Sequence, residues 1–484
     1  MGQFFNLQDL GAIAPELELM LFGMILLIAD LLVENKKWLG IIGLGGIAWS
    51  GYFLVRMLLQ FNAQDLRSVN AYSNLLVVDQ FSMFFKLLFL VAAALTIIIS
   101  LKYLDVEREH HGEYYALILL ATMGMMFMAG AADLITLYIS LETMAIATYI
   151  LVGFLRSNPR SNEASLKYFL LGAFSSGILL YGMSLLYGIA GSTSFVEIRA
   201  ALQERDINDP IAIIAVVALC AGIFFKIAAV PFHQWTPDAY EGAPTSITAY
   251  MSVAVKAASF AMLIRLFMLC IKPQEVHWLP LVTAVSVLTM TVGNIAAMTQ
   301  SNVKRLLAYS SISHAGYLLL GIVASSELGL VSIPLYLFVY AFSNMGVWAI
   351  IVALRRKNII GEQIDDLNGL VYKQPVAAIL MLVFLLSLAG IPPTAGFIAK
   401  YFLFSALIQG GHSTVAVIAV LNAAVSVYFY LRIVVAMFMK ESTEKTGLAL
   451  TPGVIIALDV GILLTMGIGL YPDPFIPFAA HALP

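Results

Sequence analysis

Apolar runs of about 20 residues recur along the whole chain, and they exclude most folds. Of the 484 residues, 61% are hydrophobic and only 11% are charged, whereas soluble domains carry roughly 25% charged residues. A run of this length crosses the hydrocarbon core of a bilayer as a helix. Lipid offers the backbone no hydrogen-bond partner, and the runs lack the alternation of barrel strands, so helices are the expected spanning structure. The sequence therefore predicts an all-α polytopic membrane protein.

The runs predict fourteen transmembrane helices joined by short loops. No loop is long enough for a soluble domain, so flavin or nucleotide chemistry is expected on another chain. Both cysteines, Cys220 and Cys270, lie in apolar runs, whereas an iron–sulfur or structural zinc site needs about four ligands. The expected spans are residues 12–34, 38–60, 77–101, 113–131, 133–155, 164–190, 211–230, 245–271, 277–299, 303–324, 329–354, 376–408, 413–438 and 452–471.

Lysine and arginine are distributed unevenly between the two sets of loops. One set carries fourteen of them, and the opposite set carries only Arg67, Arg199, Arg205 and Lys272. Basic residues are enriched in cytoplasmic loops. Both termini are therefore expected outside the cytoplasm.

Two of the predicted spans are interrupted by prolines. The interruptions read PFHQWTPDAYEGAPT (231–245) and GIPPTAG (390–396). Proline removes a backbone donor and clashes with the preceding turn, so helices seven and twelve are predicted to be broken. Paired breaks indicate an inverted-repeat transporter, here with two inverted five-helix repeats. The expected division is a three-helix segment (1–110), the repeats (111–275 and 276–440) and a last helix (441–484).

Several charged side chains lie inside the predicted spans. Glu142 and Lys256 are central in apolar runs, and Lys226 follows about 15 apolar residues. An uncompensated charge at mid-membrane costs about 2.5–3.5 kcal/mol. Lys167 and Lys400 have similar sequence surroundings. A buried lysine can lose its proton and a nearby carboxylate can restore the charged form, whereas arginine stays charged. These residues are therefore predicted to form a proton relay. For Glu142, Lys226 and Lys256, a static buried ion pair is the alternative.

Histidines and further basic residues extend this set. His233 and His314 titrate near physiological pH and are candidate members of the relay, although a plain hydrogen-bonded role is an alternative for His314. Lys86, Arg56 and Arg265 lie closer to span ends, so their side chains are expected to extend to the interface.

One acid lies within the last predicted span. Asp459 is flanked by apolar residues in GVIIALDVGILL, so it needs a partner in the membrane. Arg432 in the preceding span is the candidate, and this pair is interpreted as structural.

Five stretches resemble the antiporter-like membrane subunits of respiratory complex I. Within that family the chain is most similar to the subunit N branch of bacterial NADH-quinone oxidoreductase, the counterpart of mitochondrial subunit 2. Lys400 favours this branch, because subunits M commonly carry an acid there. The stretches are FFKIAAVPFHQWTPDAYEGAPTSITAYMSVAVKAA (224–258), LYISLETMAIATYILVGF (137–154), NEASLKYFLLGAFSSGILLYG (162–182), NVKRLLAYSSISHAGYLLLG (302–321) and GIPPTAGFIAKYFLF (390–404).

The resemblance implies a role for each matching residue. Glu142 and Lys226 would be the acid and the lysine of an input half-channel. Lys256 would connect the half-channels, Lys167 would be the sixth-helix lysine, and Lys400 would be the output lysine. Quinone reduction by partner subunits would drive proton translocation through this chain.

The resemblance also implies partners and cofactors. FMN, iron–sulfur clusters and quinone are expected on partner subunits, so this chain would bind no cofactor or metal and carry out no redox chemistry itself. It would belong to an enzyme as one subunit of a hetero-oligomer. Its partners would be other membrane-arm subunits and the lipid bilayer, and it would bind no nucleic acid.

Three alternatives stay open from the sequence. The first is a subunit of a multisubunit cation/proton antiporter, and the second is the membrane subunit of an energy-converting hydrogenase. The third is an inert spacer in a membrane complex. The buried charges count against a spacer, because a scaffold has no need of their desolvation cost.

Overall fold

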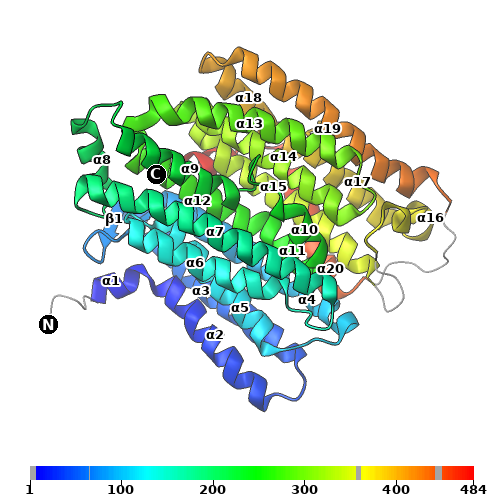
Figure 1. Cartoon of the computed structure of the whole chain (residues 1–484). Helices are drawn as coiled ribbons and strands as arrows, with labels where there is room; N and C mark the ends of the chain where they lie inside the picture. Colours follow the sequence, from blue (N-terminus) through cyan, green and yellow to red (C-terminus); the bar gives the residue numbers. More distant parts are fainter. Residues whose placement is uncertain (1–6, 65, 356–360, 442–449, 484) are drawn as a thin grey trace.

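The computed structural model describes residues 7–64, 66–355, 361–441 and 450–483, and it shows a helical bundle (Figure 1). The first part holds a short hairpin between long helices. Asp79 and Ser82 cap each other's backbone N–H at the start of α4, which fixes where the hairpin ends and the helix begins. The elements are α1 (Leu7–Ala12), α2 (Ala14–Leu32), α3 (Lys37–Gln64), β1 (Ser68–Ala71), β2 (Leu76–Asp79) and α4 (Gln80–Glu107).

The middle part contains the first break. Helix α9 ends at Lys226, and regular helix resumes only at Trp235. Two π-helical turns, η1 and η2, flank α12. The elements are α5 (Gly112–Gly130), α6 (Leu134–Val152), α7 (Pro159–Ala190), α8 (Phe195–Glu204), α9 (Pro210–Lys226), α10 (Trp235–Gly242), α11 (Thr245–Tyr250), η1 (Met251–Val255), α12 (Lys256–Arg265), η2 (Leu266–Cys270) and the 3₁₀ turn η3 (Lys272–Gln274).

The last part contains the second break, between α17 and α18. Both predicted breaks are therefore confirmed, and both lie at the proline-rich segments. The elements are α13 (Glu275–Met298), α14 (Val303–Val323), α15 (Glu327–Leu354), η4 (Ile364–Leu367), α16 (Leu370–Lys373), α17 (Pro375–Ala389), α18 (Ala395–Gln409), α19 (Ser413–Met439), α20 (Pro452–Leu470) and α21 (Phe475–Ala480).

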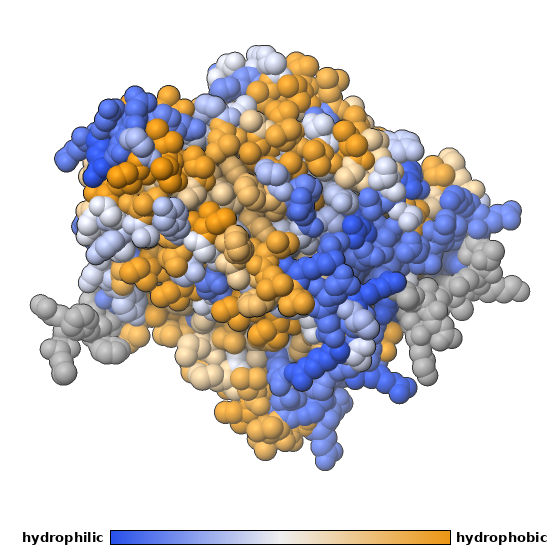
Figure 2. Space-filling view, in the orientation of Figure 1, coloured by the Kyte–Doolittle hydropathy of each residue, from blue (hydrophilic) through white to orange (hydrophobic). Residues whose placement is uncertain are grey.

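The long helices run roughly side by side between two polar ends. Within the described residues, eleven helices are long and apolar enough to cross a membrane. The other three predicted spans correspond to α2, to α9 and to the broken pair α17 and α18. Figure 2 shows hydrophilic residues gathered near α8 at one end and near α10 and α16 at the other, with a hydrophobic belt between them. The predicted all-α polytopic membrane fold is confirmed.

The centre of the bundle is formed by α12, α14 and α15. In the most apolar windows of the spans that contain them, 89–94% of the residues are buried. Gly293 and Gly316 let α13 and α14 approach closely, because a β-carbon at Gly293 would lie 2.8 Å from the Ser313 nitrogen. Small residues at a membrane helix interface allow such backbone proximity. Lys256 and His314 lie on these central helices.

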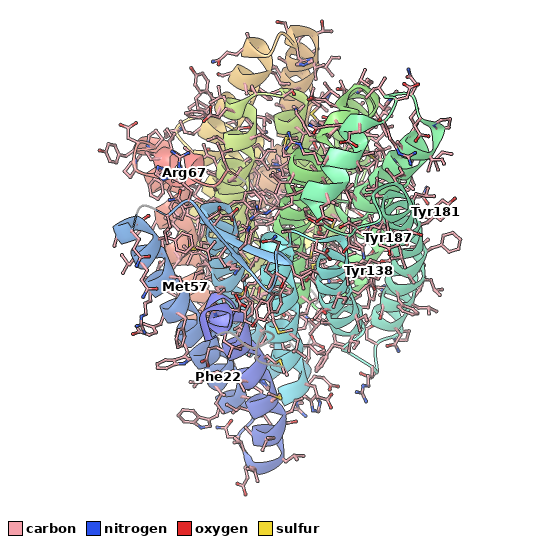
Figure 3. All side chains as sticks on the ribbon, turned by 90° about the vertical axis from the view of Figure 1, so that its left-hand side faces the viewer. Phe22, Met57, Arg67, Tyr138, Tyr181 and Tyr187 are labelled. Carbon is pink, nitrogen blue, oxygen red and sulfur yellow. The ribbon has the colours of Figure 1, made fainter. Side chains whose placement is uncertain are left out.

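The hairpin was not predicted from the sequence. Strands β1 and β2 pair antiparallel from Ser68 with Asp79 to Ala71 with Leu76, and Tyr72, Ser73 and Asn74 between them have positive φ angles. Figure 3 looks onto this end of the bundle, with Arg67 beside the hairpin and Tyr138, Tyr181 and Tyr187 on α6 and α7.

Two of the basic residues expected at the interface are instead buried. Lys86 pairs with Glu16 on α2 at 2.6 Å, with side chains only 4% and 1% exposed. Arg265 is 1% exposed and donates to Asp79 at 2.7 Å and to the Ala129 carbonyl at 3.0 Å. The expectation of interfacial side chains was wrong for these two, because each faces a neighbouring helix that supplies its acceptor. Arg56 is exposed on α3.

Candidate functional site

Lys400 lies against the second helix break. It is 4% exposed, and its Nζ donates to the carbonyls of Ala389 at 2.7 Å and Leu388 at 3.2 Å. These carbonyls end α17, where a helix carries partial negative charge. Gly390 at the break has φ +85°, and a β-carbon there would lie 2.7 Å from the Lys400 Cδ. The glycine thus allows both the turn and the approach of the lysine.

Lys226 lies at the first break. It is the last residue of α9 and is 6% exposed. Its Nζ donates to the Tyr149 hydroxyl at 3.4 Å. Ala228 beyond it has φ +62°, a left-handed conformation, and Trp235 donates to the Phe225 carbonyl at 3.0 Å. The ammonium again lies at the negative end of a helix.

Lys256 follows the π-helical turn η1 on the central span. It is 3% exposed, and its Nζ donates to the Ser311 carbonyl on α14 at 2.5 Å. Single π-helical turns occur frequently at functional sites. Three buried lysines thus share one design, since each lies beside an irregular stretch of helix and meets neutral oxygen atoms.

None of the three lysines forms an ion pair in the part of the chain that the structure describes. The salt bridges there involve other cations, including Lys86 and Arg265. A static buried ion pair, the alternative for Glu142, Lys226 and Lys256, is therefore not present among the described residues. A buried ammonium that meets only dipoles is held less firmly in its charged form than one in an ion pair.

His314 lies between Lys256 and Lys400. It is 4% exposed, with Nδ1 2.7 Å from the Tyr336 hydroxyl and Nε2 3.1 Å from the Tyr430 hydroxyl. Ser311, whose carbonyl accepts from Lys256, lies one turn before His314 on α14, and Lys400 lines a cavity with His314. The sequence-based alternative of a hydrogen-bonded histidine holds for its contacts, and its position also suits proton transfer.

A small cavity separates His314 from Lys400. Its volume is about 10 Å³, and its lining includes His314, Tyr340, Ser343, Ser387 and Lys400. A space of this size holds roughly one water molecule. The Ser343 Oγ lies 2.8 Å from the Ser387 Oγ, so these two hydroxyl groups are hydrogen-bonded to each other beside the cavity. A water molecule and these hydroxyls would connect the two titratable groups.

Glu142 lies on α6 at the outer edge of this set. It is half-buried, and its Oε1 is buried with no hydrogen-bond partner among the described residues. Tyr149 is two helical turns further along α6, and its hydroxyl accepts from Lys226. Tyr138, one turn before Glu142, is labelled in Figure 3. A buried water molecule beside this oxygen would supply its missing hydrogen bond.

Lys167 does not share the buried surroundings of the other lysines. Its side chain is 46% exposed, and its Nζ pairs with Glu163 at 2.7 Å and Asp238 at 3.1 Å. The expectation of similar surroundings was wrong, because the apolar neighbours Leu166 and Leu170 point outward, at 58% and 56% exposed. The sequence shows what flanks a residue but not which helix face it occupies.

Lys167 lines an open polar pocket beside α10. Arg305 pairs with both Asp238 and Glu241 at 2.8 Å, so one ionic network spans α7, α10 and α14. Burial alone would raise the pKa of Asp238, but Arg305 and Lys167 hold it below its ordinary value. The network therefore stays charged at neutral pH. The pocket has a volume of about 310 Å³ and is lined by Arg160, Glu163, Ala164, Lys167, Asp238, Glu241, Gly242 and Arg305.

His233 lies in the non-helical segment between α9 and α10. It is half-buried, and its Nδ1 has no hydrogen-bond partner among the described residues. No hydrogen bond of the described chain joins it to the three buried lysines. The structure brings together Lys256, His314 and Lys400, but it leaves His233 and Lys167 beside α10.

The sequence interpretation missed the hydroxyl groups of the site. These side chains lie in apolar runs, and the sequence distinguishes them only by a hydroxyl group within a predicted span. Many residues with a purely structural role have the same feature. Their importance comes from contacts between distant helices. They are Tyr149, Ser310, Tyr336, Tyr340, Ser343, Ser387, Tyr430 and Thr465.

Comparisons with known proteins point to one family. Residues 131–426 match the family described as NADH:quinone oxidoreductase/Mrp antiporter, transmembrane region. The chain is 50% identical over 485 residues to NADH-quinone oxidoreductase subunit N 2 of Solibacter usitatus, covering 99% of this chain and 98% of the relative.

Solved structures agree with the sequence relatives. A chain of respiratory complex I from Thermus thermophilus superposes with a TM-score of 0.80 at 32% identity, covering 96% of this chain and 99% of that chain. A chain of the Mrp complex from Dietzia sp. superposes with a TM-score of 0.84 at 21% identity, covering 99% of this chain and 97% of that chain. At that identity the second likeness concerns the fold alone.

Proposed function

The chain belongs to the NADH:quinone oxidoreductase/Mrp antiporter family, and on that premise we propose that it is the proton-translocating subunit N of an NADH-quinone oxidoreductase. The observation that carries the proposal is the buried series Lys226, Lys256 and Lys400, each held by neutral oxygen atoms beside an irregular stretch of helix. Such lysines can gain and lose protons within the membrane. An inert spacer would not need them.

The proposed relay runs through the centre of the bundle. Glu142 and Lys226 take up a proton at the first break, Lys256 passes it on, and His314 connects Lys256 with Lys400 at the second break. The hydroxyls of Tyr336 and Tyr430 hold the His314 ring between the two lysines. The small cavity beside Lys400 supplies room for one water molecule in the last step.

Electrostatic coupling would drive each step of the relay. A new unit charge about 10 Å away, at an effective dielectric constant of about 20, shifts a proton equilibrium by about 1.7 kcal/mol, which is more than tenfold. Lysines that meet only neutral oxygen atoms have no carboxylate to oppose such a shift. Arrival of a proton at Lys256 therefore favours its release from Lys400.

Lys167 and His233 have a separate place in this proposal. Both lie beside α10, and Lys167 lines the open polar pocket with Asp238 and Arg305. We assign the pair to proton uptake at this end of the bundle rather than to the central relay. Asp238 stays ionised at neutral pH and thus keeps the mouth of the uptake path polar.

Redox chemistry is assigned to partner subunits in this proposal. FMN, iron–sulfur clusters and quinone would be bound there, and the chain would contribute proton translocation as one subunit of the enzyme. Among the described residues, no group of three histidine, cysteine, aspartate or glutamate residues could hold a metal ion. Cys220 and Cys270 are both buried and unpaired by disulfide.

The division into repeats is also part of the proposal. We assign α5–α12 to the first five-helix repeat and α13–α19 to the second, following the expected boundaries 111–275 and 276–440. Each repeat then contains one broken helix with a buried lysine. The segment before them (1–110) and the last helix (441–484) flank the pair.

Lys400→Arg tests the exit step of the relay. Arginine would keep a positive charge against the α17 carbonyls, so the complex should assemble, but it cannot release its proton. We expect proton pumping per assembled complex to fall more than tenfold in membrane vesicles. Lys440→Arg, at an exposed ion pair with Asp365, is the matched control and should pump normally. Full pumping by Lys400→Arg would remove Lys400 from the relay.

The proposed orientation has both termini on the periplasmic side. A single cysteine at Asn62, near the end of α3, should react with an impermeant maleimide applied to intact cells. A cysteine at Ser157, between α6 and α7, should react only after the membrane is opened. Both sites are exposed, and the buried Cys220 and Cys270 are replaced beforehand. The reverse labelling pattern would invert the assigned direction of proton uptake and release.

A further inference from the structure

Asp459 is an exposed acid within a membrane-spanning helix. It lies on α20, about 10 Å along the helix from Pro452 and about 16 Å from Leu470 at 1.5 Å per residue. Both ends are too distant for a short carboxylate to reach the interface, whereas lysine and arginine can extend that far. The carboxylate therefore lies at the depth of the hydrocarbon.

The chain itself supplies no partner for Asp459. Across the described residues, no hydrogen bond or ion pair reaches its carboxylate. Arg432, the partner expected from the sequence, donates to the Met298 carbonyl instead and lines a pocket with Asp365 and Lys440. The predicted Asp459–Arg432 pair was wrong, because Arg432 lies on a part of α19 that faces α13.

The opposite face of α20 is the one packed against this chain. A β-carbon at Gly461 would lie 3.2 Å from the Phe384 ring and 3.3 Å from the Phe342 carbonyl. Gly461 is two residues, about 200°, around the helix from Asp459. The Asp459 side instead carries an exposed apolar stripe, with Ile456 at 49% and Leu463 at 69% exposed. The acid thus lies in the middle of a face that points away from the bundle.

We propose that this face of α20, defined by Ile455, Ile456, Asp459 and Leu463, docks a transmembrane helix of a partner subunit that presents a lysine or arginine to Asp459. An acid exposed to lipid is costly, and ionisable residues in spans pair with one another or face the protein interior. An apolar stripe with one central carboxylate fits an apolar helix with one basic residue at the same depth. The contact concerns assembly and does not depend on the proton relay.

Charge complementarity distinguishes this partner from lipid. Lipid acyl chains would cover the apolar stripe but would leave the carboxylate unpaired. A basic side chain from a neighbouring helix would pair with it and specify both register and orientation. The acid would then act as a recognition element, rejecting a helix that presents an acid or an apolar residue there.

The test compares Asp459→Leu and Asp459→Lys in the full complex. The complex is purified in mild detergent through a tag on this chain, and the co-purifying membrane subunits are counted per chain by mass spectrometry. We expect Asp459→Lys to lower the recovery of one neighbouring subunit at least tenfold, and Asp459→Leu to lower it less. Asp473→Asn, which removes an exposed acid beyond the end of α20, is the matched control and should assemble normally.

A photoreactive residue at Leu463 in the otherwise unchanged chain identifies the neighbour without disturbing the acid. It should capture one membrane subunit, and changing the basic residue of the captured helix to aspartate should restore assembly of Asp459→Lys. The crosslink from Leu463 identifies the neighbour even if the Asp459→Lys variant fails to insert into the membrane. Capture of lipid alone, or normal assembly of both Asp459 variants, would overturn the proposal. Either result would leave the proton relay untouched, because pumping is measured separately.

Discussion

Replacing Lys86 by methionine is expected to destabilise the chain by about 3–5 kcal/mol and to remove most of it from assembled complex. Lys86 Nζ and Glu16 Oε1 form a buried pair at 2.6 Å between α4 and α2. The second carboxylate oxygen of Glu16, Oε2, has no hydrogen-bond partner among the described residues. Methionine fills a similar volume, so the change isolates the loss of charge. The amount of the chain in purified complex and the thermal stability of that complex measure the effect.

The double variant Lys86→Met/Glu16→Leu is the matched control. Removing both charges leaves no unpaired ion in the bundle, and replacing a buried pair by apolar residues is often neutral or stabilising. The double variant should therefore recover most of the assembled complex. A single Lys86→Met variant as stable as the unchanged chain would show that Glu16 needs no cation, and the pair would lose its structural role.

The different outcomes for lysines show what the sequence can and cannot predict. The apolar residues around Lys226 and Lys256 predicted correctly that both lysines are buried, at 6% and 3% exposed. Lys86 and Lys167 were misplaced because depth does not determine the helix face. Lys86 faces Glu16, whereas Lys167 faces an open pocket.

The two helix breaks were predictable for a local reason. Proline removes a backbone donor and clashes with the preceding turn, so the proline clusters in segments 231–245 and 390–396 indicate the breaks without tertiary information. Single prolines do not suffice, since Pro280 and Pro334 lie within the continuous helices α13 and α15. The acceptors that the breaks expose were not predictable. The contact of Lys400 with the Ala389 carbonyl depends on how the start of α18 is placed relative to the end of α17, and no local pattern encodes that placement.

The hydroxyl groups around His314 were not predictable from the sequence either. Tyr336 lies on α15 and Tyr430 on α19, and both meet a histidine on α14. Each tyrosine alone resembles the other aromatic residues of its span. Their arrangement arises only when three helices pack together, so it belongs to the tertiary structure.

Replacing Lys256 by methionine is expected to abolish most proton pumping without loss of assembly. Unlike Lys86, Lys256 has no carboxylate partner, and its one hydrogen bond goes to the Ser311 carbonyl. Methionine would therefore remove a desolvated charge and leave no unpaired ion behind. The folded chain should be as stable as before, while the central station between Lys226 and His314 is lost. Pumping should fall more than tenfold.

Lys256→Met and Lys86→Met thus make opposite predictions from the same chemical change. The first should lower pumping in a normal amount of complex, and the second should lower the amount of complex. The difference depends only on whether a buried carboxylate is left unpaired.

The most direct test of proton translocation by this chain measures two rates in vesicles with Lys256→Met complex, proton movement across the membrane and electron delivery to quinone. Both rates are normalised to the amount of assembled enzyme. The relay predicts that proton movement falls at least tenfold per assembled complex, with electron transfer either slowed in parallel or uncoupled from pumping. An unchanged proton number per electron at an unchanged rate of electron transfer would contradict it, because protons would then cross the membrane without the central lysine of this chain.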